Sequence, residues 1–178
     1  MNINITNLDS TIEHWASIDG YLNYQVSWWG RVVNTKTGRI LKAGRSSNSY
    51  LSVVLCKGGK MKSHSVHVLV AREWVPNPDN KRCVDHIDGD RHNNHHSNLR
   101  YATRSENSRN MKKHSDGSSI YKGVSLDKKS GKWRAQIYKP GSSQHLGYFA
   151  SEREAAQAYN ASASELHKEY AKLNILID

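Results

Sequence analysis

The sequence lacks the features that mark secreted and membrane proteins. Its 178 residues include only two cysteines, Cys56 and Cys83, too few and too widely spaced for a disulfide framework or a cysteine-rich zinc module. No apolar run approaches the roughly 18 residues of a membrane helix. The first ten residues have neither the basic start nor the apolar core of a signal peptide. We therefore expect a cytoplasmic protein without membrane contact.

Apolar and acidic residues are also scarce. The apolar share is 37% and the mean hydropathy is -0.77, while 26 Lys and Arg against 16 Asp and Glu give a formal charge of +10. The central residues 51–115 hold 7 of the 10 histidines and 12 of the basic residues. Five Trp and nine Tyr accompany this charge, so nucleic acid is the favoured partner, although anionic lipids and acidic proteins also attract basic chains.

Local patterns predict short elements joined by turns. Strands are expected at 26–29, 31–33 and 39–41, and a hairpin at 50–56 and 61–66. A short helix is expected over 66–74, with Ser65 as N-cap and Pro76 marking its end. The polar segment 114–119 is typical of a linker.

The segment 84–110 carries the strongest chemical signal. Residues 84–87 alternate as in a strand, Asp88-Gly89 is a hairpin turn signal, and 99–101 can be the returning strand. Thr103 and Glu106 fit a capping box, which starts a helix there. A hairpin crossed by a helix lets Asp85, His86 and Asn107 converge on one point.

That convergence suits phosphodiester hydrolysis. Asp85 offers a hard anionic oxygen and Asn107 a carbonyl oxygen, which together suit one Mg²⁺ (or Mn²⁺) ion. A histidine such as His86 can take a proton from water near neutral pH.

These residues resemble the HNH nuclease motif of group I intron and phage homing endonucleases. The resemblance rests on Asp85-His86, Asn98, Asn107, the Asn pair 93–94 and the preceding VHVLVAREWVPNPDN. It implies that His86 is the general base, that Asp85 and Asn107 bind the metal, and that Asn98 fixes the loop and orients His86. Arg100 and Arg104 are expected to contact DNA.

Other histidines allow two interpretations. His92, His95 and His96 could hold a metal, but we favour a solvated loop because no cysteine completes a zinc site. His67 is more consistent with packing or capping than with ligation.

Residues 120–178 predict three strands followed by one helix. The strands are expected at 120–125, 133–138 and 144–149, and Ser151 with Glu154 forms a capping box before an alanine-rich helix. The words YKGV, GKWRAQI, LGYF and KLN resemble the apetala-two/ethylene-response-factor DNA-binding domain. That resemblance implies a sheet laid on DNA, with a phosphate-dominated grip because Ser125 replaces the usual Arg. The expected DNA contacts are Lys122, Lys128, Lys129, Lys132, Arg134, Gln136, Tyr138 and His145.

The N-terminal words EHWASIDGYLNYQVSWWGRV and TGRILK resemble a nuclease-associated modular domain. Its implied role is structural support or DNA contact, with Arg31, Lys36, Arg39 and Lys42 as possible phosphate contacts.

The expected fold is α+β with several modules. A β-rich N-terminal module (1–50) precedes a ββα-metal HNH nuclease (51–113), a linker (114–119) and a C-terminal three-stranded antiparallel sheet packed on one helix (120–178). The expected function is a site-directed homing endonuclease without small-molecule cofactor, acting on double-stranded DNA as a monomer and nicking one strand. It would work in the host cytoplasm if phage-encoded. A DNA-binding regulator with an inactive HNH fold and a less specific HNH nuclease remain alternatives.

Overall fold

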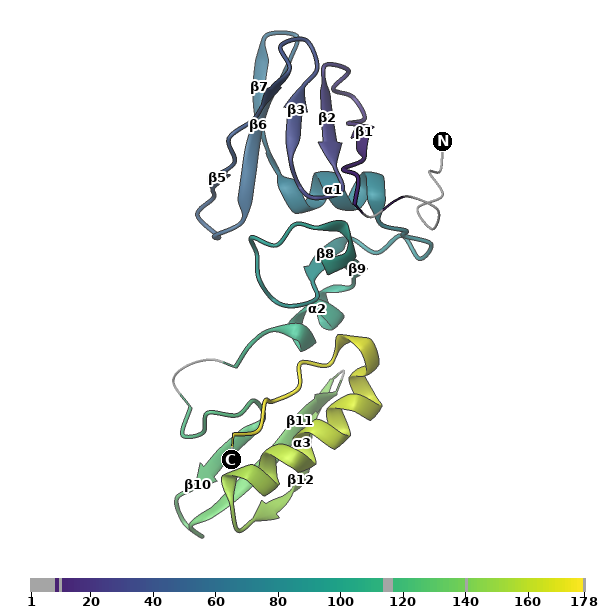
Figure 1. The fold of residues 1–178 in the computed structure, drawn as a ribbon. Coiled ribbons are helices and arrows are strands. Elements are labelled where there is room, and N and C mark those ends of the chain that lie inside the picture. The colour runs from purple at the N-terminus through teal and green to yellow at the C-terminus, as the bar shows by residue number, and fades with distance from the viewer. Residues whose placement is uncertain (1–8, 10, 114–116, 140, 178) are drawn as a thin grey trace. The chain divides into compact units, whose positions relative to one another are not determined.

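A computed structural model describes residues 9, 11–113, 117–139 and 141–177 of the chain (Figure 1). Residues 114–116 of the predicted linker, Pro140 of a predicted turn and nearly all of the first ten residues lie outside this part. The contacts divide the chain into two compact units, 1–103 and 104–178, which are described separately below.

The first unit is built mainly from short antiparallel strands. Its elements are, in chain order, β1 (Trp15–Ser17), β2 (Tyr24–Ser27), β3 (Val32–Asn34), β4 (Arg39–Ile40), β5 (Gly44–Arg45), β6 (Leu51–Lys57), β7 (Lys60–Ser65), α1 (Val66–Trp74), β8 (Cys83–His86), the 3₁₀ helix η2 (His96–Asn98) and β9 (Leu99–Ala102). They form sheets in the orders β1-β2-β3-β4, β5-β6-β7 and β8-β9.

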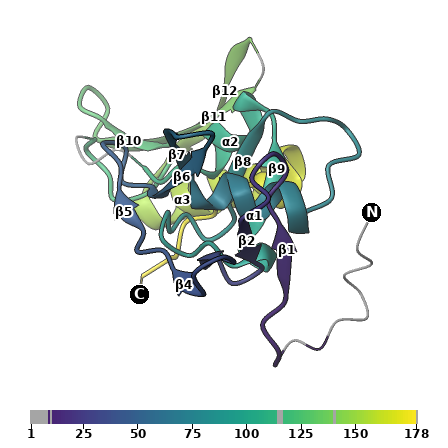
Figure 2. The same cartoon turned by 90° about the horizontal axis from the view of Figure 1, so that it is seen from above.

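One hydrophobic core joins the N-terminal sheet, β6 and α1. Val26, Val53, Val70 and Trp74 are all at most 2% exposed and belong to this core. The indole Nε1 of Trp74 donates to the carbonyl oxygen of Val26 at 3.2 Å. The β5-β6-β7 sheet lies beside these elements in both cartoon views (Figures 1 and 2). The predicted module boundary at 50/51 stays a prediction, since shared packing does not test which segment acts independently.

The second unit combines a short helix with a sheet and a longer helix. Its elements are α2 (Arg104–Asn110), β10 (Val124–Asp127), β11 (Lys132–Lys139), β12 (Ser142–Phe149), α3 (Glu152–His167) and the 3₁₀ helix η3 (Lys168–Tyr170). The antiparallel order is β10-β11-β12, and α3 lies along one face of this sheet (Figure 1). Ala155, Ala156 and Ala163 are fully buried there, because small side chains let the helix approach the strands closely.

Two predicted helix starts have different outcomes. The Ser151 hydroxyl accepts from the Glu154 backbone, and the Glu154 side chain accepts from the Ser151 backbone, so the predicted capping box is confirmed. Ser65 does precede α1, but its side chain makes no capping hydrogen bond. Helix α1 instead follows β7 directly, and burial of its apolar side stabilises it.

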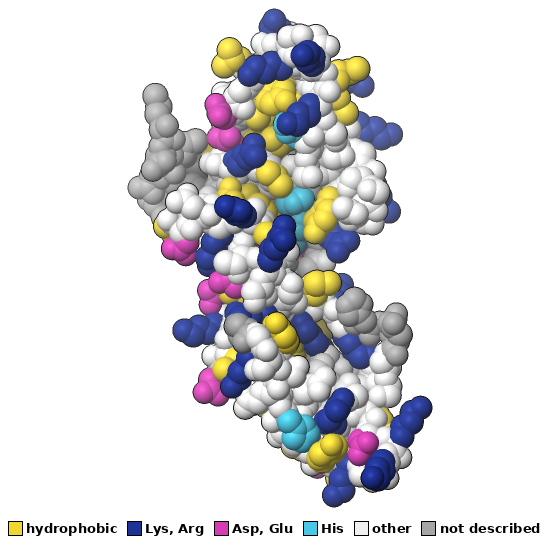
Figure 3. All heavy atoms as spheres, turned by 180° about the vertical axis from the view of Figure 1, so that it is seen from behind, with side chains coloured by type: hydrophobic (Ala, Val, Ile, Leu, Met, Phe, Trp, Pro, Cys, Tyr) yellow, Lys and Arg dark blue, Asp and Glu magenta, His cyan; other side chains and the backbone are white. Residues whose placement is uncertain are grey.

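Basic side chains are spread over the surface of both units, with fewer acidic ones among them on the face drawn in Figure 3. Within the described residues, no helix has the length and apolar character needed to cross a membrane.

Candidate active site

The β8-β9 hairpin carries the central predicted residues. Asp85 pairs with Arg100 and His86 with Leu99 across the two strands. Asp85 and His86 are buried, with 5% and 4% of their residue surface exposed. Two adjacent polar residues are rarely buried without a partner, so their contacts decide what this hairpin can do.

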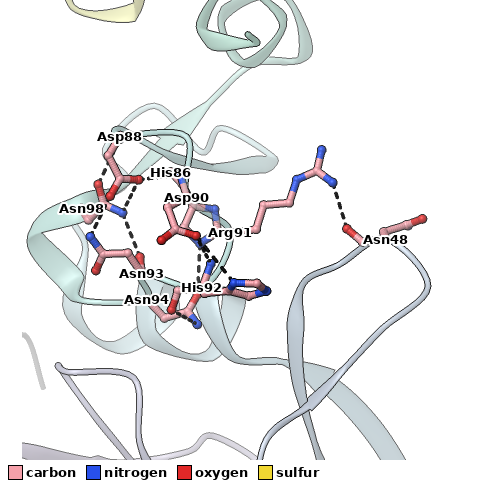
Figure 4. Close-up of polar contacts among 9 residues, drawn as sticks. All are labelled: Asn48, His86, Asp88, Asp90, Arg91, His92, Asn93, Asn94 and Asn98. Atoms are coloured by element: carbon pink, nitrogen blue, oxygen red, sulfur yellow. Dashed lines mark hydrogen bonds and ion pairs between the residues drawn. The ribbon is translucent and has the colours of Figure 1, made fainter. Parts of the chain in front are cut away.

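Asn98 organises the loop between the two strands (Figure 4). Its amide nitrogen donates to Asp88 Oδ1 at 2.9 Å and to the Asn93 carbonyl oxygen at 2.8 Å, and its side-chain oxygen accepts from the Asp88 backbone at 3.1 Å. Burial would raise the pKa of Asp88, but hydrogen bonds from Asp90, Asn93 and Asn98 outweigh it and lower that pKa. The contacts agree with a loop-fixing role for Asn98.

His86 takes its orientation from Asn94 rather than from Asn98. The imidazole Nε2 lies 3.0 Å from Asn94 Oδ1, and both side chains are labelled in Figure 4. An amide oxygen only accepts, so in the neutral imidazole the proton is on Nε2 and the lone pair on Nδ1. Asn94 is 4% exposed. Sequence reasoning noted the Asn pair 93–94 but assigned Asn94 no part in the site.

An aromatic stack packs against His86. The ring of Tyr50 lies 5.9 Å from His86 and 4.6 Å from His67, and the two imidazoles are 5.0 Å apart, measured between ring centroids. Burial, with a smaller contribution from His86, lowers the pKa of His67 to about 4. His67 is thus a packed neutral histidine, in agreement with the favoured interpretation.

Arg100 binds Asp85 directly. Its Nε and one terminal nitrogen lie 2.9 Å and 2.8 Å from Asp85 Oδ2. The side chains of this ion pair are 14% and 6% exposed. Sequence reasoning expected Arg100 to contact DNA, whereas the structure places its guanidinium on the carboxylate predicted to bind metal.

Asn107 lies in α2, in the second unit, and is half-buried. Its role as a metal ligand with Asp85 therefore stays a prediction. Arg104 begins the same helix and is exposed.

The three clustered histidines take separate partners. His95 accepts from the Ser97 backbone and caps η2, His96 stacks on Trp28 at 4.9 Å between ring centroids, and His92 Nδ1 lies 3.8 Å from Asp90. Among the described residues there is no group of three or more His, Cys, Asp or Glu placed to hold a metal.

The N-terminal sheet supports the loop that holds Asn94. The backbone nitrogen of His96 donates to the Trp28 carbonyl oxygen at 2.7 Å. Gly30 has a φ of +89°, and a Cβ on it would lie 2.8 Å from the Asn94 Cβ. Only glycine therefore fits this position without displacing the residue that orients His86.

The predicted DNA contacts of the second unit fall into three groups. Arg134, Gln136 and Tyr138 alternate with the buried Ala135 and Ile137 on β11, and so lie on the sheet face away from α3. Gln136 pairs with His145 of β12. Lys128, Lys129 and Lys132 are exposed around the β10-β11 turn.

Lys122 has a different position. Its ammonium group donates to the carbonyl oxygens of Arg109 and Met111 at 2.5 Å and 2.7 Å. It therefore holds the C-terminal end of α2, a contact that the sequence did not indicate, and its expected contact with DNA stays a prediction.

Two family models match this chain in its first two thirds. Residues 64–109 match the HNH endonuclease model, and residues 13–56 match the NUMOD4 motif. The hairpin just described lies within the segment that matches the HNH endonuclease model.

Curated relatives agree with these matches. DNA endonuclease I-HmuI of Bacillus phage SP01 is 40% identical over 98 residues, covering 54% of this chain and 56% of that protein. The uncharacterized HNH endonuclease L245 of Acanthamoeba polyphaga mimivirus is 34% identical over 96 residues, covering 54% of this chain and 29% of the relative. The chain thus spans less than two thirds of either protein.

A solved structure is also similar. It concerns DNA binding and cleavage by the HNH homing endonuclease I-HmuI. The TM-score is 0.52 and the identity is 40%, over 55% of this chain and 56% of that one.

Proposed function

We propose that this chain is a site-directed DNA endonuclease of the homing type, which hydrolyses phosphodiester bonds with one divalent metal ion. The observation that carries the proposal is the buried Asp85-His86 pair on β8, with His86 oriented by Asn94. This pair lies inside the segment that matches the HNH endonuclease model. Cleavage of DNA by the similar I-HmuI supports DNA as the substrate.

His86 would act as the general base. Its Nε2–H is directed to Asn94 Oδ1, so Nδ1 is the atom that accepts a proton from the attacking water. Asn98 keeps the intervening loop in shape through Asp88 and Asn93. Arg and Lys side chains would hold the neighbouring phosphates.

Asp85 and Asn107 would hold the metal. A carboxylate and an amide oxygen are donor types that Mg²⁺ and Mn²⁺ use, and such sites need few protein ligands, so this donor set fits. When bound, the ion supplies stabilisation of the charge that develops on the phosphate and on the leaving oxygen. When no ion is bound, the ion pair with Arg100 compensates the charge of the buried Asp85 carboxylate.

The second unit would bind DNA through the open face of the β10-β11-β12 sheet, as in an apetala-two/ethylene-response-factor domain. Arg134, Gln136, Tyr138 and His145 would face the duplex, with Lys128, Lys129 and Lys132 at its phosphates. We propose that the protein acts as a monomer and nicks one strand, in the cytoplasm of a host cell if a phage encodes it.

Mapping of cleaved ends on tiled phage DNA with Mg²⁺ tests this proposal. A defined cut position that recurs in overlapping fragments supports site-directed cleavage. Cleavage of unrelated DNA at equal rates identifies a less specific nuclease instead, and binding without any cleavage identifies a regulator.

A further inference from the structure

A cavity in the second unit has no place in the proposed chemistry. Its volume is about 570 Å³, and it lies between α2, the segment around Lys122, one end of the β11-β12 sheet and α3, which contributes Tyr159 and His167. Four basic side chains line it: Arg104, Arg109, Lys122 and His167. None of the described residues that line it is acidic.

Two nitrogens at this cavity are buried without a hydrogen-bond partner in the described part of the chain. They are Arg109 Nε and His167 Nδ1. Because His167 Nε2 donates to the Tyr138 carbonyl oxygen, Nδ1 of the neutral ring is an acceptor, so only the arginine nitrogen is a donor without an acceptor. The arginine side chain stays charged at all relevant pH values and its nitrogens only donate. Because none of the described residues lining the cavity is acidic, the charge of Arg109 adds to its positive potential, which favours an anion there.

The remaining basic groups point to the same kind of ligand. The Lys122 ammonium is held by two neutral carbonyl oxygens, which do not offset its charge. Burial, with a smaller contribution from Lys172, lowers the pKa of Lys122 to about 8. An anion in the cavity would compensate these charges, and the hydroxyl groups of Ser105 and Ser108 at its wall can donate to oxygens.

We propose that this cavity binds a phosphate group, and that the phosphate belongs to the DNA backbone. Gln136 and Tyr138, which lie on the open face of the sheet, also line the cavity. A DNA strand that crosses the open face and continues over this end of the sheet could therefore place one phosphate in the cavity. This inference rests on the proposed DNA-binding function and adds an anchoring site that the open face alone does not provide.

The test measures DNA affinity of the full chain in EDTA against NaCl concentration. The Arg109→Gln variant should weaken binding and reduce the slope of log K against log [NaCl] by about 1, the change expected for one lost phosphate contact. Arg153→Gln removes one charge from the exposed side of α3, away from the cavity, and should leave the slope unchanged. Equal slopes for wild type and Arg109→Gln would overturn the inference.

A second variant, Ser143→Asp, gives a result that a folding defect cannot imitate. Ser143 is an exposed residue of β12 and lines the cavity. The new carboxylate would occupy the place of the anion, so the melting temperature should rise while DNA affinity falls. A fall in both, or no change in either, would contradict a phosphate site.

A melting experiment separates the two sources of phosphate. Inorganic phosphate, compared with NaCl at equal ionic strength, should stabilise the wild type more than Ser143→Asp. If that difference appears but Arg109→Gln leaves the DNA slope unchanged, the ligand is a free phosphate and the DNA assignment fails. Nicking by the wild type is measured separately with Mg²⁺. If the wild type nicks DNA but Arg109→Gln leaves the salt slope unchanged, only this inference is wrong. If Arg109→Gln reduces the slope but the wild type does not nick DNA, only the proposed enzyme activity is wrong.

Discussion

The imidazole of His86 is hydrogen-bonded to the side-chain oxygen of Asn94, with 3.0 Å between Nε2 and Oδ1. This contact selects the tautomer whose Nδ1 can accept a proton. It also links the candidate base to the N-terminal sheet, because Asn94 packs on Gly30.

Replacement of Asn94 tests its role in positioning His86. Asn94→Ala should reduce nicking by up to roughly a hundredfold, because a misplaced base loses the reacting geometry. Asn94→Asp keeps an acceptor oxygen and should retain more activity. Its carboxylate should shift the acidic limb of the pH–rate profile to higher pH, because it stabilises the protonated imidazole. A purely structural role predicts no such shift.

Gly30→Ala should disturb the same contact from the N-terminal side. The new Cβ would lie 2.8 Å from the Asn94 Cβ, so both the melting temperature and the nicking rate should fall. Gly38 is the matched control, since its φ of +69° is also positive but a Cβ there meets nothing within 4 Å. Gly38→Ala should cost only the backbone strain, about 1 kcal/mol. Equal loss of activity in both variants would argue against the packing explanation.

The stability of the first unit should depend on pH through His67. Its pKa is about 4 in the folded chain, against about 6.5 in an unfolded one. The unfolded state therefore binds the proton first, and stability should be lost as pH falls from about 6.5 towards 4. His67→Phe keeps the ring and removes the titration. Over this pH range, the free energy of unfolding measured in urea should fall less in this variant than in the wild type, by on the order of 3 kcal/mol. If the free energies of unfolding of the wild type and His67→Phe change with pH in the same way, the assigned burial of His67 is contradicted.

Arg100→Met should be strongly destabilising. It removes the guanidinium that pairs with the buried Asp85 carboxylate, and breaking one side of such a pair costs roughly 3–5 kcal/mol. The double variant Arg100→Met/Asp85→Leu should recover much of that loss, because no buried carboxylate remains. If the wild type and Arg100→Met unfold at the same denaturant concentration, the ion pair contributes little to stability.

Much of the secondary structure follows from local patterns. The strands around Asp85 and Leu99, helix α1 and the Ser151 capping box were all indicated by periodicity, turn residues and cap spacing. Strand β10 spans Val124–Asp127, whereas the sequence predicted it further toward the N-terminus, at 120–125. Residues 120 and 121 are instead held by side chains: Glu152 accepts from the Ile120 backbone and Ser119 from that of Tyr121.

The contacts among the candidate site residues could not be predicted from the sequence. Asn94 lies in an irregular loop and Asn98 ends the short helix η2, and in both residues side chain–backbone hydrogen bonds rather than periodicity fix the direction of the side chain. The pairing of Arg100 with Asp85 depends on strand register, which the sequence left open. The close approach of Gly30 to Asn94 joins residues 64 positions apart, which no local pattern indicates.

Relaxation of a supercoiled plasmid that carries the mapped site tests the central claim most directly. With Mg²⁺, the wild type should convert it to the open circle. His86→Ala should bind the same DNA in a gel shift yet nick it on the order of 10²–10⁴-fold more slowly, the usual effect of removing a general base. Nicking by His86→Ala at the wild-type rate would contradict the account.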